Sequence, residues 1–122
     1  MTHRLTYTAI TLGSVFLWAM SWAQSGMGAM PLKAPSASSA EPHIARGIEQ
    51  YNKGHWARAK KHFARAAKID PASAEAHYDL ALALDKLNDH VRAKGHFKKA
   101  YELGKTNAEI QGSDVLKKHL GL

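Results

Sequence analysis

A chain of 122 residues has room for one domain, and removal of an export leader would leave roughly 100 residues, near the lower limit for an independent core. The chain contains no cysteine, which excludes disulfide bonds, thiolate metal sites and a lipid-modified leader. Its formal net charge of +7 favours acidic partners or anionic surfaces.

Residues 1–23 have the order of a secretory signal peptide. A positively charged start is followed by an apolar stretch over residues 9–20, and small residues stand near Ala23. This order predicts export, to the periplasm or the medium, with cleavage after Ala23. The alternative is a retained inner-membrane anchor over residues 5–23, because that stretch approaches the ~20 residues of a membrane span. Export argues against a nucleic acid partner.

Residues 24–40 shift to serine, alanine, glycine and proline and contain few branched apolar side chains. Such a composition predicts a flexible linker. The alternative is that Met27, Met30 and Leu32 dock in a groove of their own or of a neighbouring molecule.

From residue 40 onward the chain repeats itself, because residues 74–107 match residues 40–73 at many equivalent positions. The match predicts repeat 1 over residues 40–73 and repeat 2 over residues 74–107, within a domain over residues 41–121. The identical pairs are Ala40 and Ala74, Glu41 and Glu75, His43 and His77, Arg58 and Arg92, Ala59 and Ala93, Lys60 and Lys94, His62 and His96, Phe63 and Phe97, and Ala66 and Ala100.

Apolar residues recur at helical spacing within both repeats. Small alanines beside a phenylalanine allow a neighbouring helix to approach closely, so these faces are predicted to form the core. The predicted core faces are Ala59, Phe63 and Ala66; Ala93, Phe97 and Ala100; and Leu80, Leu84 and Leu87.

Turn and capping residues divide the repeats into helices. Pro71 ends one predicted helix, and Asp89 begins another after a turn. A closing helix is predicted over residues 108–120, capped by Asn107 and ended by Gly121. This helix is expected to cover the apolar side of the last repeat.

The chain resembles the tetratricopeptide repeat family, for which a period of about 34 residues with two helices per unit is typical. The resemblance implies an all-α array of helix-turn-helix units that forms a right-handed superhelix. The residues that fit the family pattern are Gly47, Gly54, Ala59, Phe63, Ala66 and Pro71 in repeat 1, and Leu80, Ala81, Ala93, Phe97 and Ala100 in repeat 2.

The sequence departs from the family pattern at a few positions. Arg46 and Gln50 stand where large apolar residues are usual, and Lys105 stands where proline usually ends a unit. The first helix is therefore expected to be weakly amphipathic. The two alternatives are that it docks loosely or that Tyr51 and Trp56 compensate.

The resemblance also implies that the concave side of the array is a protein-binding surface. The expected partner is another protein or a peptide, so the chain would act as a scaffold or interaction module. Because arrays of this kind usually need at least three repeats, self-association is a further expectation. The expected groove residues are Ile44, Ile48, Tyr51, Asn52, Tyr78, Leu82, Asp85, Lys86, Leu116 and His119.

A positive stripe follows the second helix of repeat 1. Arg58, Lys61, Arg65 and Lys68 stand three or four residues apart, which places them on one face of the expected convex side. One interpretation is a solvated face that keeps a small protein soluble. The other is a peripheral membrane protein whose basic residues contact anionic headgroups.

The eight histidines do not predict a metal site. None stands three or four residues from another, and His43 with His77, like His62 with His96, is separated by a whole helix pair. No metal and no cofactor are therefore predicted. The third hypothesis for the function, after the two above, is a metal-responsive protein that uses the repeated histidines.

The carboxylates also lack a catalytic pattern. The predicted surface or capping residues are Glu49, Asp79, Asp85 and Asp89. No serine stands in a tight glycine turn beside a base, so the sequence does not predict an enzyme.

Overall fold

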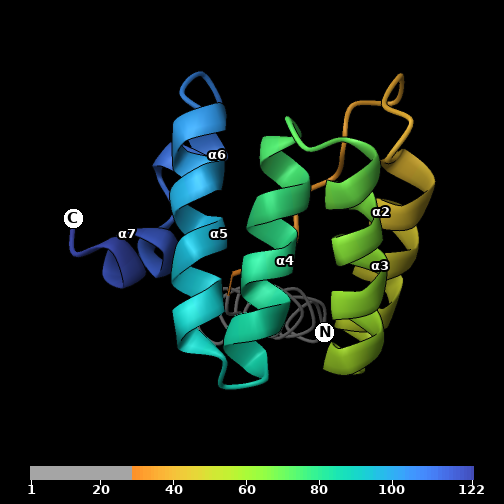
Figure 1. The fold of residues 1–122 in the computed structure, drawn as a ribbon, viewed down its shortest axis with the longest axis horizontal. Helices are drawn as coiled ribbons and strands as arrows, with labels where there is room; N and C mark the ends of the chain where they lie inside the picture. The colour runs from red at the N-terminus through yellow and green to blue at the C-terminus, as the bar shows by residue number, and fades with distance from the viewer. Residues whose placement is uncertain (1–28) are drawn as a thin grey trace, which may run out of the picture. The chain divides into compact units, whose positions relative to one another are not determined.

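The computed structural model describes residues 29–122 (Figure 1). The chain divides into two compact units, Met1–Met30 and Pro31–Leu122. The predicted signal peptide and the linker up to residue 28 lie outside the described residues. The second unit contains α2 (Glu41–Asn52), α3 (Trp56–Ile69), α4 (Ala74–Lys86), α5 (His90–Leu103), α6 (Ala108–Gln111) and α7 (Asp114–Leu120).

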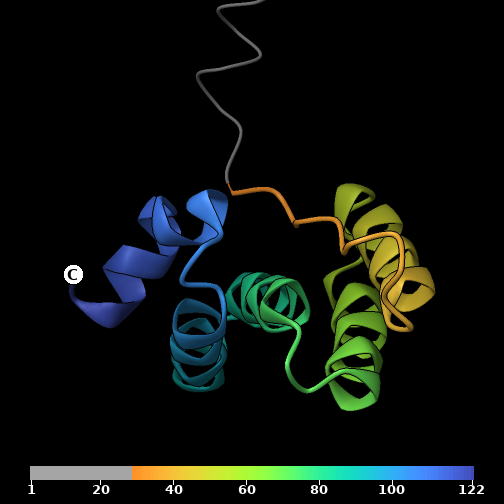
Figure 2. The same ribbon diagram turned by 90° about the horizontal axis from the view of Figure 1, so that it is seen from above.

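These helices form two antiparallel pairs followed by a short helical end, as the repeat predicts. Within each pair, α2 packs against α3 and α4 packs against α5, while α3 also packs against α4 and α5 against α7. Figure 2 shows α3 and α5 on one side of the array, residues 31–40 on the opposite side, and α4 between them. None of the helices in residues 29–122 combines the length and apolar character that crossing a bilayer requires.

The predicted core faces of α3 and α5 are confirmed. Phe63 and Phe97 have no exposed surface, and neither do the alanines on either side of them. Leu80 and Leu84 are buried as well. Leu87 is 36% exposed, so its predicted core position is wrong: it is the C-cap of α4, where the chain turns away from the core.

Gly47 permits the close approach of α2 to α3. A Cβ atom at this position would overlap the ring of Phe63. Repeat 1 therefore needs glycine on α2 so that the phenylalanine of α3 can fill the space between the helices.

Side-chain caps fix the starts of the later helices. The Ser73 hydroxyl accepts from Ala76 N–H at 3.1 Å, and Asp89 accepts from Arg92 N–H at 3.2 Å. Asn107 accepts from the first backbone N–H groups of α6. The predicted starts at Asp89 and Asn107 are confirmed, and each cap satisfies backbone donors that the helix leaves unpaired.

The closing helix expected over residues 108–120 is divided in two. α6 ends at Gln111, and α7 begins after Ser113, whose hydroxyl accepts from Leu116 N–H at 3.3 Å. Gly112 between them is a weak helix former, and Ser113 is a strong N-cap residue, so the chain changes direction there. Gly121 ends α7 with a φ of 73°, as its C-cap role predicts.

The first helix, α2, is clearly amphipathic, with Ile44, Gly47 and Tyr51 buried, so the expected weak amphipathicity is wrong. Aromatic packing also holds the end of this helix. The rings of Tyr51 and Trp56 meet edge to face with their centroids 4.8 Å apart. The Nζ atom of Lys86 lies 5.4 Å from the centroid of the Trp56 ring. Repeat 1 is thereby joined to the end of α4.

Candidate functional site

The structure buries five of the ten expected groove residues. Asn52 and Lys86 are exposed, and Ile48, Asp85 and His119 are half-buried. The apolar groove residues of α2 and α4 are therefore largely closed to solvent. The buried groove residues are Ile44, Tyr51, Tyr78, Leu82 and Leu116.

Part of the covering comes from the chain itself, because residues 31–34 lie against the helices. Pro31 is buried. Ala34 packs with Ile48 against a buried cluster that includes Ile44. A pocket of about 300 Å³ lies beside this contact, lined by Lys33, Ala34, Glu41, Ile44, Ala45 and Ile48. The described part of the predicted linker thus packs on the array.

One buried hydrogen bond fixes this segment. The backbone N–H of Leu32 donates to Oδ1 of Asp79 at 2.6 Å. Asp79 has no exposed surface, and its Oδ2 atom has no hydrogen-bond partner within residues 29–122. Burial raises the pKa of the Asp79 carboxyl well above its usual range, although the bond from Leu32 acts in the opposite direction.

The prediction that Asp79 is a surface or capping residue is therefore wrong. α4 is the central helix of the array, and every residue from Ala76 to Leu84 is buried. A carboxyl group within this segment cannot reach solvent. The nearly unbroken apolar run around Asp79 was the signal in the sequence that could have identified it.

Two tyrosines of the expected groove are held in the interior. Burial raises the pKa of Tyr51 to about 12, and it also raises the pKa of Tyr78. The hydroxyl oxygen of Tyr78 lies 2.7 Å from the hydroxyl oxygen of Ser113, which connects α4 to the start of α7. The Tyr78 hydroxyl group thus serves the packing of the array.

The repeated histidines pair within each repeat. His77 and His96 stack with ring centroids 5.3 Å apart, and their repeat equivalents, His43 and His62, stack at 6.4 Å. The sequence pattern relates each histidine to its equivalent in the other repeat, whereas its neighbour in space belongs to the same repeat. The reason is that the two helices of one repeat are antiparallel and lie side by side.

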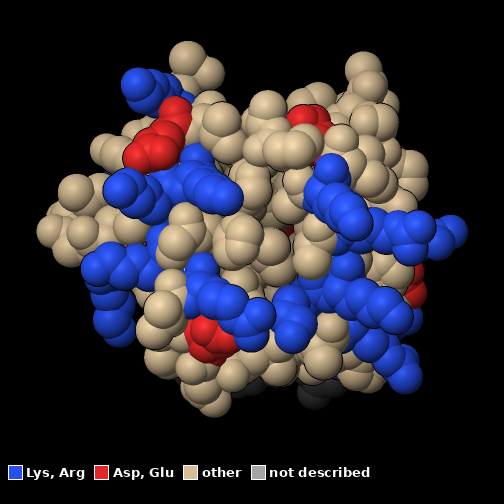
Figure 3. All heavy atoms as spheres, in the orientation of Figure 1, with Lys and Arg blue, Asp and Glu red and all other residues tan. Residues whose placement is uncertain are grey.

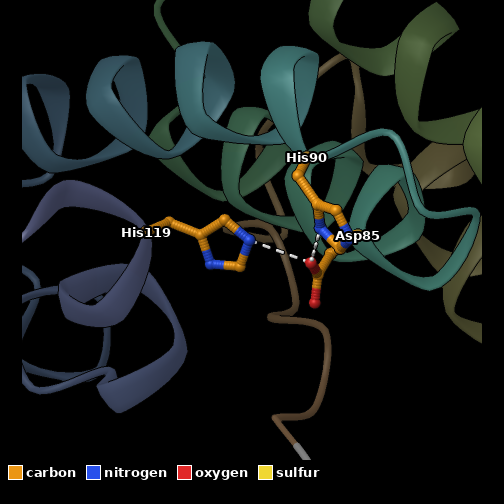
Figure 4. A group of neighbouring side chains, drawn as sticks. All are labelled: Asp85, His90 and His119. Carbon is orange, nitrogen blue, oxygen red and sulfur yellow. Dashed lines mark hydrogen bonds and ion pairs between the residues drawn. The ribbon is translucent and has the colours of Figure 1, made fainter.

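A second group combines two histidines with a carboxylate (Figure 4). Oδ1 of Asp85 lies 2.8 Å from Nδ1 of His90 and 2.9 Å from Nε2 of His119. Asp85 comes from the last turn of α4, His90 begins α5, and His119 lies near the end of α7. No fixed spacing along the sequence predicts this group, because the path of α7 brings His119 to the other two.

The expected basic stripe lies on exposed surface. Arg58, Lys61, Arg65 and Lys68 are all exposed. Figure 3 shows lysine and arginine side chains as the predominant charged groups on the face that it presents. A pocket of about 450 Å³ lies between α3 and the second repeat, lined by Ala57, Lys60, Lys61, Ala64, Leu80, Leu84, Arg92 and His96.

Comparison with known proteins identifies the repeat. Residues 40–73 match the family model of the tetratricopeptide repeat. No curated protein matches the chain. The matched segment contains α2 and α3, and α4 and α5 repeat the same arrangement. Repeats of this family are typically non-catalytic and mediate binding between proteins. Residues 40–73 thus form a tetratricopeptide repeat, and the described part of the chain has two helix pairs followed by a closing helical segment.

Proposed function

We propose that this chain is an exported protein-interaction module whose concave groove binds an extended peptide segment of a partner. The observation that carries the proposal is the hydrogen bond from Leu32 N–H to the buried carboxyl group of Asp79. Residues 31–34 lie in the groove in the manner expected of a peptide ligand.

The chemistry of this contact favours recognition of a backbone. A buried carboxyl oxygen that accepts a hydrogen bond from a main-chain N–H can recognise an extended segment. This contact does not depend on the side chain at that position. Specificity would come from neighbouring positions, where Pro31 is buried and Ala34 packs against Ile44 and Ile48. A ligand with small apolar residues or proline at these positions fits the surroundings.

The groove offers further contacts at its edges. Asn52 and Lys86 are exposed and can meet a bound segment, and Ile48 is half-buried. The pocket beside Ala34 has room for an additional apolar side chain of a ligand. A partner segment would therefore replace residues 31–34 and extend beyond them.

A peptide competition experiment tests the groove. The probe is a synthetic peptide with the sequence of residues 29–36, and its matched control carries an N-methyl group on the residue equivalent to Leu32. In the full chain, Leu32→Pro removes the N–H group that donates a hydrogen bond to Asp79. The substitution therefore weakens the binding of residues 31–34 to the groove. The probe should therefore bind this variant more tightly than it binds the unmodified chain.

The N-methyl control measures the backbone contact itself. It should bind the Leu32→Pro variant at least about 10-fold more weakly than the probe does, because it leaves the buried acceptor of Asp79 unpaired. Equal binding of both peptides would show that the groove does not recognise the backbone.

Export rests on residues 1–23 and has its own test. The proposal predicts that the protein recovered from the exported fraction lacks these residues and begins at Gln24. Intact mass spectrometry measures this directly. A full-length mass in the membrane fraction would support the anchored alternative.

The basic face supports a second candidate function, peripheral binding to anionic membranes. The pocket next to the stripe is lined by the apolar side chains of Leu80 and Leu84 and by the basic residues Lys60 and Arg92. Each basic residue near a lipid surface contributes about 1 kcal/mol. Lys61→Glu should therefore reduce cosedimentation with phosphatidylserine vesicles, and added salt should release the unmodified protein. Cosedimentation that is insensitive to both would exclude this function.

A further inference from the structure

Asp85, His90 and His119 bring three potential metal ligands to one point at the end of the array. Their ligand atoms all lie within 4.8 Å of one another. Figure 4 shows both imidazole rings directed at the Asp85 carboxylate from separate helices. Two histidine nitrogens and one carboxylate oxygen are a ligand set that zinc and related divalent ions accept.

The hydrogen bonds of His119 leave one of its ring nitrogens available to a metal ion. Its Nδ1 atom lies 2.9 Å from the carbonyl oxygen of Val115, which can only accept, so Nδ1 carries the proton. In a neutral ring, Nε2 then presents a lone pair. That lone pair faces Oδ1 of Asp85, a second acceptor, at 2.9 Å. A metal ion held between these two atoms would make this contact attractive.

We propose that Asp85, His90 and His119 bind a divalent transition-metal ion of the zinc class. The bond from His119 Nδ1 to Val115 holds the ring in the tautomer that leaves Nε2 free to coordinate. Histidine ligands of metals commonly make such a bond to a backbone carbonyl with the second nitrogen. The geometry around His119 is therefore that of a metal ligand before any ion arrives.

The distances are close to those that coordination requires. Ligand atoms about 2.0 to 2.1 Å from a tetrahedral zinc ion lie roughly 3.3 Å apart. The two distances from Asp85 Oδ1 to the histidine nitrogens, 2.8 and 2.9 Å, need to open by about half an ångström to reach that value. The side chains of His90 and Asp85 are 61% and 25% exposed and can move apart, whereas that of His119, at 14% exposed, is the most confined of the three.

An ion can reach the site from solvent. The three side chains line a pocket of about 400 Å³ together with Val115 and Lys118. Lys118 is exposed, and its flexible side chain can turn its ammonium group away from an incoming cation. Three protein ligands leave one coordination position for water or for a group from a partner.

A bound ion would join three helices. It would connect the last turn of α4, the first residue of α5 and the end of α7. The short α7 would then be fastened to the last helix pair by coordination bonds as well as by packing. Metal binding is thereby expected to slow the opening of α7.

Titration of the full chain with zinc sulfate, followed by calorimetry, tests the proposal. We expect one zinc ion per chain. His90→Gln removes the most exposed ligand and should weaken binding at least about 10-fold, and Asp85→Asn should do the same. The matched control is His96→Gln. His96 stacks on His77 and is not among the three proposed ligands, so this substitution should leave the zinc affinity unchanged.

Hydrogen exchange gives a second measurement that does not depend on the heat of binding. Zinc should slow exchange of the backbone amides of α7 in the unmodified chain and in His96→Gln, and not in His90→Gln. Absence of zinc binding to the unmodified chain would overturn the proposal. Loss of binding in His96→Gln with retention in His90→Gln would overturn it as well.

Discussion

The Nδ1 atom of His77 on α4 lies 3.1 Å from the Nδ1 atom of His96 on α5. The Nε2 atom of His77 lies 2.8 Å from the carbonyl oxygen of Pro71, so this nitrogen carries the proton. His77 Nδ1 therefore accepts from the Nδ1–H of His96.

Stability should fall when the pH drops through the range in which free histidine titrates. Burial, followed by the charge of His77, lowers the pKa of His96 below its ordinary value of 6.5. The unfolded chain then binds more protons than the folded chain below about pH 6.5, so the free energy of unfolding decreases as the pH falls. Urea unfolding between pH 5 and 8 measures this slope.

The variant His96→Gln isolates the contribution of the His77–His96 pair to the pH dependence of the free energy of unfolding. A glutamine amide can still donate toward His77 but does not titrate, so we expect a shallower slope below about pH 6.5. An unchanged slope would show that other groups cause the pH dependence.

Asp79 should give a pH dependence of the opposite sign. Burial raises the pKa of Asp79, so above the ordinary value of 3.8 the folded chain holds a proton that the unfolded chain releases. The titration of Asp79 therefore lowers the free energy of unfolding as the pH rises from that value up to the raised pKa.

The variant Asp79→Asn removes this titration while keeping an oxygen that accepts from Leu32. We expect the variant to be at least as stable as the unmodified chain at pH 7, and to lose that advantage at pH 4, where both chains hold a neutral group at this position. Urea unfolding at the two pH values measures the difference. A large loss of stability at pH 7 would show that the ionised carboxylate is required.

Two glycine substitutions should have opposite effects. Gly47→Ala places a Cβ atom against the Phe63 ring and should destabilise the domain by about 1 to 3 kcal/mol. Gly95 lies within α5, and the space around the position that a Cβ atom would take is open, so Gly95→Ala should stabilise by about 0.5 to 1 kcal/mol. Thermal unfolding of both variants measures the two changes in stability. Equal effects would contradict the close packing of α2 on α3.

Removal of the Ser113 hydroxyl should loosen α7. Ser113 caps this helix and also contacts the Tyr78 hydroxyl, so Ser113→Ala should cost about 1 to 2 kcal/mol. Tyr78→Phe removes the hydroxyl contact and leaves the cap, so its cost should be about 0.5 to 1.5 kcal/mol. Urea unfolding compares the two variants, and a greater loss for Tyr78→Phe would mean that the cap contributes little.

The repeat architecture could be predicted from the sequence because it depends on local signals. Helix faces appear as apolar spacing, as with Phe63 and Phe97, and helix starts appear as capping residues, as with Asp89 and Asn107. Each signal lies within a few residues of the feature that it determines. Leu87 departs from the pattern because a helix end points its last residue away from the core.

The contacts that segments distant in the sequence make with the groove residues could not be predicted in the same way. The contact between Leu32 and Asp79 spans 47 residues, and the contact between Asp85 and His119 spans 34. Both depend on how segments outside the helix pairs lie on the finished array. Helical spacing predicts that Tyr78 and Leu82 lie on one face of α4, and both are buried, but the spacing does not tell which part of the chain covers them.

The short connection between Ala34 and α2 has a consequence for any ligand of the groove. Residues 35–40 tether the internal segment so closely that its effective concentration at the groove is on the order of millimolar. If this segment binds with an intrinsic Kd of about 1 μM, a free competitor would appear roughly 1000-fold weaker than its affinity for an empty groove. The tether would thus set a minimum affinity for ligands of the groove. Tight or multivalent ligands would displace the internal segment, whereas weak apolar peptides, which could bind an open groove, would not.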